Sequence, residues 1–141
     1  VDNPRNETTV PVFPASNKFL IFSCLWIYCF QAINLTFFLT TFFDQASTAA
    51  AICGFVHFIS FIPWPPLSSQ YNTLSKNFKM MSTIIPLFGN GHAWYLISTL
   101  EGRNVGLQWY NLDQPVISKQ TDMSVFEVFS LIILSGLINR G

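Results

Sequence analysis

Few side chains in this sequence could take part in chemistry, and most of them lie inside long apolar runs. Gln31 and Asn34 are three positions apart, a spacing that places both amides on the same face of a helix. Such a polar stripe in an apolar helix indicates either the lining of a substrate path or a hydrogen bond to a neighbouring helix. His57 lies among apolar residues with no carboxylate nearby, so it indicates either an intramembrane functional group or a neutral contact between helices.

Motifs for covalent, metal or nucleotide chemistry are absent from the sequence. Cys24, Cys29 and Cys53 all lie in apolar runs, and they have neither the even number of a disulfide framework nor the spacing of metal ligands. None of the seven glycines is followed by Gly-Lys at the spacing of a phosphate-binding loop, and there is no Gly-x-Ser-x-Gly nucleophile elbow. We therefore expect no catalytic, metal-binding or cofactor-binding residues in this chain, and no ATP hydrolysis by the chain alone.

The composition indicates a membrane protein. The hydrophobic share is 50% and the charged share is 10%, whereas soluble domains contain about 25% charged residues. Seven Lys and Arg residues balance seven Asp and Glu residues, and a net charge of zero gives no electrostatic footprint for binding nucleic acid. Residues 19–43 and 45–75 contain no charged residue, and both stretches exceed the about 20 apolar residues that a helix needs to cross a bilayer. The predicted fold class is an all-α integral membrane protein, a polytopic helical bundle.

The polar breaks between the apolar runs predict a helix hairpin at residues 19–62. Residues 1–18 contain three prolines and no apolar periodicity, so they are expected to form a loop, with Ser16 or Asn17 capping the helix that follows. Residues 44–48 form the turn of the hairpin. The prolines directly after residue 62 are predicted to end the second helix, because proline lacks the amide donor that a helix interior requires.

The second helix carries small residues, which would let a neighbouring helix approach its backbone closely. They are Ala49, Ala50, Ala51 and Gly54. Replacement of Ala50 or Gly54 by leucine is therefore expected to damage helix packing.

The remainder of the chain is predicted to contain shorter helices. In residues 63–122, Pro86, Gly89 and Gly91 break the apolar sequence into runs too short to cross a membrane, which favours a re-entrant or interfacial hairpin of short amphipathic helices. The run at residues 128–138 is also too short, so residues 123–141 are expected to be the start of a truncated transmembrane helix. The chain begins with Val1 and ends just after an apolar run, which suggests a fragment.

Two blocks of sequence carry a family resemblance. The first is Thr40-Thr41-Phe42-Phe43-Asp44-Gln45-Ala46, followed by Ala49, Ala50 and Gly54. The second is Glu101, followed by Gly106-Leu107-Gln108-Trp109 and Asn111. In this order and separation the two blocks resemble the membrane domains of subfamily A of the ABC transporters, the full-length lipid exporters, with the surfactant phospholipid exporter branch as the most similar.

The resemblance implies a place for each segment in a six-helix membrane half. Residues 19–43 correspond to the fourth helix, 46–62 to the fifth, 67–122 to the extracytoplasmic helical hairpin, and 124 onward to the start of the sixth. The loop at the start of the chain is then extracytoplasmic and the 44–48 turn cytoplasmic, although a turn without basic residues belongs outside by the positive-inside rule. The family's sixth helix usually carries Asp where this chain has Ser135.

The function implied by the resemblance is that of a membrane-domain fragment of an ATP-driven lipid transporter. Such a fragment forms part of the path for phospholipid or sterol, with Gln31 and Asn34 contacting headgroups. Its partners are the remaining transmembrane helices and the nucleotide-binding domains, which bind ATP and Mg²⁺ elsewhere in the full-length, ATP-hydrolysing chain. The expected location is a plasma membrane or an endo-lysosomal membrane. The alternative is a small multi-pass scaffold or assembly protein without transport activity.

Overall fold

The structure is a computed structural model that describes residues 11–116 and 123–138. Within these residues it is helical, and its one isolated β-bridge joins Pro115 and Ser124, so the predicted all-α class is confirmed for the described part of the chain. The parts of the predicted loop 1–18 and of segments 63–122 and 123–141 that fall on residues 1–10, 117–122 and 139–141 lie outside the described residues. The elements are α1 (Lys18–Thr40), α2 (Ala46–Phe61), α3 (Trp64–Ser69), the 3₁₀ turn η1 (Tyr71–Thr73), α4 (Lys76–Thr83), α5 (Pro86–Gly102) and α6 (Val125–Ile138).

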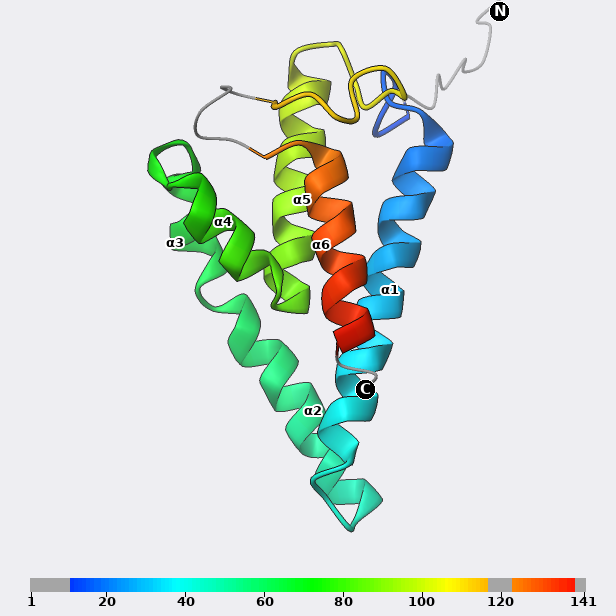
Figure 1. Cartoon of the computed structure of the whole chain (residues 1–141), viewed down its shortest axis with the longest axis vertical. Coiled ribbons are helices and arrows are strands. Elements are labelled where there is room, and N and C mark those ends of the chain that lie inside the picture. The colour runs from blue at the N-terminus through cyan, green and yellow to red at the C-terminus, as the bar shows by residue number, and fades with distance from the viewer. Residues whose placement is uncertain (1–10, 117–122, 139–141) are drawn as a thin grey trace, which may run out of the picture.

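Helices α1 and α2 form a long antiparallel hairpin (Figure 1). Helix α1 begins where the sequence predicted, because the Asn17 side chain accepts a hydrogen bond from the Phe19 amide and so caps the helix. Two stretches, Lys18–Thr40 and Ala46–Ser69, are long and apolar enough to cross a membrane by length and composition. We call the end of the bundle with residues 11–17 and 103–116 the loop end, and the end with residues 41–45 the turn end.

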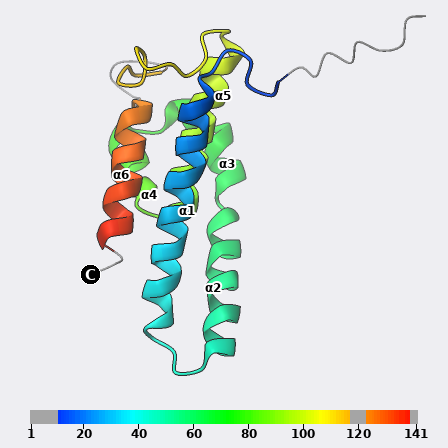
Figure 2. The ribbon, with the colours of Figure 1, turned by 90° about the vertical axis from the view of Figure 1, so that its right-hand side faces the viewer.

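The prolines after α2 interrupt the helix without ending the apolar stretch. Helix α2 ends at Phe61, close to the predicted residue 62, but α3 begins at Trp64 and continues toward the loop end (Figure 2). Proline is tolerated in the first turn of a helix, because the amide donor that it lacks has no intrahelical partner there. The second apolar stretch is therefore longer than the segment that the sequence predicted.

This part of the chain does contain two short helices, α4 and α5, but they are joined at residues 84–85, directly before Pro86. Gly89 and Gly91 lie inside α5, which corrects the expectation of a bend at these glycines. Both glycines let other groups approach the α5 backbone closely. A Cβ atom at Gly89 would lie 2.9 Å from the Ile132 side chain of α6, and one at Gly91 would lie 2.7 Å from the Trp64 ring. The physical reason for these glycines is helix packing.

The hydrophobic core lies where α5 and α6 pack against the part of α1 nearest the loop end (Figure 1). The buried residues of α1 recur every three or four positions, as one stripe on a helix requires, and they are Leu20, Cys24, Ile27, Gln31 and Asn34. The opposite face of α1 is apolar and exposed, with Trp26 at 64% and Phe37 at 66%. Such a face fits contact with lipid or with other apolar helices.

Candidate functional site

At the loop end, the carboxylate of Glu101 binds the segment that leads into α1. Its Oε1 atom accepts a hydrogen bond from the Ala15 amide at 2.8 Å, and its Oε2 atom accepts one from the Ser16 hydroxyl at 2.5 Å. Glu101 lies in the last turn of α5, so these two bonds join α5 to the start of α1. We call residues 15–17, Glu101 and residues 106–111 the clasp.

The other side of the clasp is the loop that follows α5. Ser16 Oγ accepts a hydrogen bond from the Leu107 amide at 2.9 Å, and the Asn17 amide donates to the Leu107 carbonyl at 2.8 Å. Gln108 Nε2 donates to the Ala15 carbonyl at 2.6 Å. Residues about ninety positions apart are thus joined by backbone and side-chain hydrogen bonds.

Gly106 is required in the clasp for two independent reasons. Its φ angle is +63°, in the left-handed region that side chains with a Cβ atom rarely adopt. A Cβ atom there would also lie 2.3 Å from the Ala15 carbonyl carbon. Asn111 holds the loop in this shape, since it donates to the Gly106 carbonyl and accepts from the Gln108 amide, both at 2.8 Å.

Trp109 completes the contact with α1. Its ring stacks on Phe19 with centroids 6.0 Å apart and an angle of 30° between the planes, and 60% of its side chain remains exposed. The structure therefore brings Gly106, Gln108 and Trp109 together against the start of α1. The sequence analysis had considered Ser16 only as a helix cap, and no local signal links it to Glu101.

The residues of the first sequence block lie at the turn end, far along the hairpin from the clasp (Figure 1). The hydroxyls of Thr40 and Thr41 donate to carbonyls one turn earlier in α1, each at 2.7 Å. Phe42 contacts Phe38 edge to face with centroids 5.2 Å apart, while Phe43 is half-buried. Of the small residues in α2, Ala49 is buried, whereas Ala46, Ala50 and Gly54 are exposed.

Gln31 joins three segments in the middle of the bundle. It is fully buried, and its Nε2 atom donates to Ser135 Oγ of α6 and to the Ile84 carbonyl between α4 and α5. Its Oε1 atom has no hydrogen-bond partner among the described residues. Asn34 is also buried, but its Nδ2 atom donates to the Phe30 carbonyl of its own helix at 2.8 Å.

The two histidines form hydrogen bonds with groups no more than ten residues away in the sequence. His57 Nδ1 lies 2.8 Å from the Cys53 carbonyl one turn earlier in α2. His92 is fully buried in α5, and its Nε2 atom lies 2.8 Å from Ser82 Oγ of α4. No group of three or more metal-ligating side chains occurs in the parts of the chain that the structure describes.

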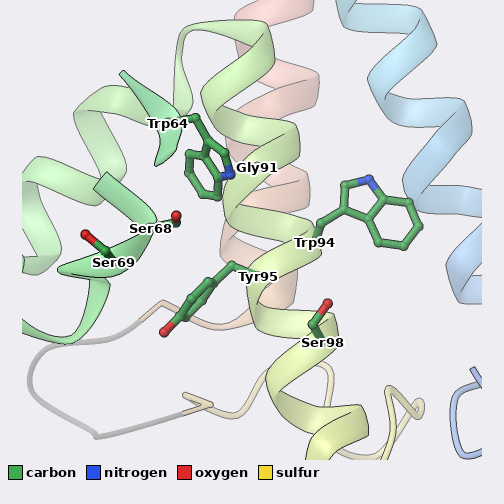
Figure 3. A pocket seen from close by; sticks show the side chains of 7 residues that line it. All are labelled: Trp64, Ser68, Ser69, Gly91, Trp94, Tyr95 and Ser98. Atoms are coloured by element: carbon green, nitrogen blue, oxygen red, sulfur yellow. The ribbon is translucent and has the colours of Figure 1, made fainter. Parts of the chain in front are cut away.

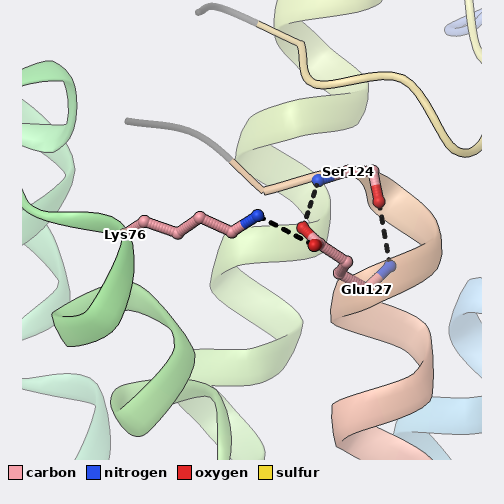
Figure 4. Close-up of polar contacts among 3 residues, drawn as sticks. All are labelled: Lys76, Ser124 and Glu127. Carbon is pink, nitrogen blue, oxygen red and sulfur yellow. Dashed lines mark hydrogen bonds and ion pairs between the residues drawn. The ribbon is translucent and has the colours of Figure 1, made fainter. Parts of the chain in front are cut away.

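An ion pair joins α4 to the start of α6 (Figure 4). Lys76 Nζ lies 2.8 Å from Glu127 Oε1, and Ser124 and Glu127 exchange hydrogen bonds between side chain and backbone amide at 3.0 and 3.1 Å. Burial by itself raises the pKa of the Glu127 carboxyl, but the hydrogen bonds from Lys76 and Ser124 and the charge of Lys76 outweigh it and lower the pKa below its ordinary value. Ser-x-x-Glu before an apolar run is a capping box, a signal that could have placed the start of α6.

The fold and these contacts define a helical segment in which a hairpin, long and apolar enough to cross a membrane, is joined to shorter helices at one end. No protein-family model matches the chain. Curated relatives do match it. The chain is 27% identical over 132 residues to human phospholipid-transporting ATPase ABCA3, covering 94% of this chain and 8% of that protein.

Two further human relatives belong to the same subfamily. Identity to ATP-binding cassette sub-family A member 13 is 33% over 106 residues, covering 75% of this chain and 2% of the relative. Identity to the glucosylceramide transporter ABCA12 is 28% over 125 residues, covering 88% of this chain and 5% of the relative. The resemblance to subfamily A of the ABC transporters is therefore confirmed, and the chain spans less than a tenth of the length of these relatives.

Proposed function

We propose that this chain forms part of the membrane domain of an ATP-driven lipid transporter and contributes to the path that the lipid follows. The observation that carries the proposal is the alignment of 94% of the chain with a phospholipid-transporting ATPase. A second relative is named as a glucosylceramide transporter, so both names describe the movement of lipids. The chain itself supplies helices and loop contacts to this function.

The outer surface of the hairpin supports contact with lipid. Phe22 and Trp26 of α1 and Phe55 of α2 expose more than 60% of their side chains, although they are large and apolar. Covering such surface by lipid chains is favourable by about 25 cal/mol per Å² relative to water. These faces therefore suit a lipid-facing surface or the packing of further helices.

Gln31 and Asn34 are our candidates for polar contacts along the path. Both are buried, so a headgroup would reach them only when α6 separates from α1 and the bond between Gln31 and Ser135 opens. The unpartnered Gln31 Oε1 atom would then be an acceptor for a hydroxyl or amine. This contact couples exposure of the amides to movement of α6.

Energy for transport has to come from other parts of the assembly. The sequence contains no phosphate-binding loop, so we assign the binding of ATP and Mg²⁺ to nucleotide-binding domains outside this chain. The partners in this proposal are those domains, the remaining transmembrane helices, and a phospholipid or sterol. We place the clasp on the extracytoplasmic side of the membrane and the turn of the hairpin, predicted at residues 44–48 and found at residues 41–45, on the cytoplasmic side. The membrane in this proposal is a plasma membrane or an endo-lysosomal membrane.

The test is a chimera in which this chain replaces the aligned segment of human ABCA3, purified and reconstituted in phosphatidylcholine liposomes. We expect ATP turnover that phospholipid stimulates, and none from the isolated chain. A variant chimera with its phosphate-binding lysines replaced is the control for background hydrolysis. A folded chimera whose ATP turnover ignores every lipid tested would contradict the proposal and favour a scaffold without transport activity.

A further inference from the structure

The His92 side chain is fully buried where α3, η1 and α4 pack against α5. Its ring contacts the ring of Trp64 in α3 edge to face and the ring of Tyr71 in η1 at a tilt, with centroids 5.4 Å apart in both cases. Trp64 lies on the α5 backbone at Gly91, and Tyr95 extends from the same side of α5 (Figure 3). We give the name histidine junction to the following five residues: Trp64, Tyr71, Lys79, Ser82 and His92.

The hydrogen bonds of the histidine junction fix which nitrogen of His92 carries a hydrogen. Ser82 Oγ donates its single hydrogen to the Lys79 carbonyl at 2.9 Å, so it accepts from His92 Nε2 at 2.8 Å. Neutral imidazole has one N–H group, and the network assigns it to Nε2. The Nδ1 atom is buried and has no hydrogen-bond partner among the described residues. A second proton would have to bind to this atom.

A protonated His92 would find no acceptor at Nδ1 and no carboxylate paired with it in the described part of the chain. Lys79 is buried, and its Nζ atom lies 4.0 Å from the centroid of the Tyr71 ring, which itself contacts His92. Two positive charges would then share one buried site, which is unfavourable.

The neighbouring elements bring other titratable side chains to this region. They are Lys76 and Lys79 of α4, Tyr71 of η1, Tyr95 of α5, which stacks on Tyr71, and Glu127 of α6. The carboxylate of Glu127 is paired with Lys76, and α3 contains no titratable side chain.

These surroundings lower the pKa of His92, which lies outside the two stretches that are long and apolar enough to cross a membrane. Burial, and second the positive charge of Lys79, lower this pKa from the ordinary 6.5 to about 4. When the histidine junction opens, His92 meets water and its pKa returns to the ordinary value. The closed junction is therefore fully stable above pH 6.5 and loses stability as pH falls from 6.5 to about 4.

Helix α4 is the element that can move away from His92. It contains eight residues, of which Lys79 and Thr83 are buried. A link of two residues, Ile84 and Ile85, connects it to α5. The Ile84 carbonyl accepts a hydrogen bond from Gln31, so movement of α4 would also act on the central amide.

We propose that the histidine junction is an acid-sensitive latch, in which neutral His92 holds α4 against α5 and protonated His92 releases it. Histidines that become charged at about pH 5 to 6 switch packing contacts in this way. The inference rests on the proposed function only for the side of the membrane, because an extracytoplasmic loop end faces the acidic lumen in an endo-lysosomal membrane. Release of α4 would also remove one hydrogen bond of Gln31, so acid would favour exposure of that amide.

The test measures hydrogen exchange of the full 141-residue chain in nanodiscs of palmitoyl-oleoyl-phosphatidylcholine at about pH 7 and about pH 5. Rates are converted to protection factors, which correct for the effect of pH on exchange itself. We expect protection of the α4 amides to fall about 10- to 30-fold at the lower pH, from the difference between the pKa values of about 4 and 6.5 for the closed and open junction. Glu127 stays ionised at both pH values, because its pKa is lowered from the ordinary 4.5.

Two histidine variants separate the latch from general effects of acid. His92→Gln keeps a donor for Ser82 and cannot be protonated in this range, so α4 should show equal protection at both pH values. The matched control is His57→Gln in α2, where the imidazole contacts the Cys53 carbonyl of its own helix, and this variant should keep the full pH dependence. An NMR titration of the His92 ring in the unchanged chain does not depend on the folding of any variant, and its midpoint should lie below 6.5.

Equal protection of α4 at both pH values in the unchanged chain would overturn the proposal. So would a loss of protection that persists in His92→Gln, a loss spread evenly over α1, α2 and α6, or a His92 titration with its midpoint at 6.5 or above. Exchange and titration in nanodiscs do not require ATP turnover by the chimera. Failure of the latch and failure of the transporter function are therefore distinguishable.

Discussion

Replacing Gly106 by alanine should open the clasp. The left-handed φ of +63° costs an L-residue about 1 to 2 kcal/mol. The new Cβ atom would lie 2.3 Å from the Ala15 carbonyl carbon, so the loop and residues 15–17 would have to separate. Three hydrogen bonds join this loop to residues 15–17. Losing two or three of them, at about 0.5 to 1.5 kcal/mol each, brings the expected loss of stability to about 2 to 6.5 kcal/mol.

The assay is hydrogen exchange of the chain in nanodiscs, read at the Asn17 and Leu107 amides. The Asn17 amide donates to the Leu107 carbonyl and the Leu107 amide to Ser16 Oγ, so both should lose protection when the clasp opens. The matched control is Gly102→Ala, because Gly102 is the last residue of α5, has open space around its Cα, and does not have a positive φ. There we expect a small gain in stability, from the higher helix propensity of alanine.

Equal protection in Gly106→Ala and Gly102→Ala would refute the reasoning. It would mean that the loop adapts without separating from residues 15–17. Loss of protection throughout α2 as well would show global unfolding, in which case the variant could not report on the clasp alone. Gln108→Leu provides a milder second perturbation, since it removes only the bond to the Ala15 carbonyl.

The other predictions concern helix packing, pH and the central amide. Ala49→Leu should destabilise the isolated chain by about 1 to 3 kcal/mol, because it overpacks a buried site. Gly54→Leu should leave the stability of the isolated chain unchanged and should impair folding only where further helices are present. Thermal unfolding of each variant measures both effects. The pKa of Glu127 is lowered in the folded state, so the ion pair with Lys76 should stabilise the chain fully above the ordinary carboxyl pKa and less as pH falls through the lowered pKa. Lys76→Gln should reduce this pH dependence, measured as the change in unfolding temperature between about pH 7 and about pH 3. Gln31→Leu should weaken the contact between α1 and α6, so the backbone amides of α6 should exchange their hydrogens faster. An unaltered exchange rate would show that the hydrogen bond from Gln31 to Ser135 does not hold these helices together.

Most of the secondary structure was predictable because its signals are local. Charge-free runs longer than a bilayer is thick marked α1 and α2, and the cap of α1 was narrowed to Ser16 or Asn17 by their position before the first run; the structure has Asn17. Where prediction failed, a tertiary contact overrode a local rule. Gly89 and Gly91 predicted a break, but α5 continues through them; glycine stands at both positions because Ile132 and Trp64 occupy the space that side chains would need.

The candidate site shows the same division. The second sequence block could be singled out by its resemblance to a family, and its residues do lie together in the clasp. That Glu101 and Gly106 hold residues 15–17 could not be inferred, because no pattern in either segment specifies a partner so far away in the chain. The role of Ser135 as the partner of Gln31 was equally hidden.

The sequence by itself determined that this chain is helical, apolar and suited to a membrane, because hydropathy and charge act residue by residue and need no knowledge of neighbours. Only the tertiary structure decided which polar groups are satisfied and by what. The structural role of a buried amide, carboxylate or glycine depends on the atoms that pack against it. In this chain those atoms come from segments about 50 to 100 residues distant, brought together by helix packing.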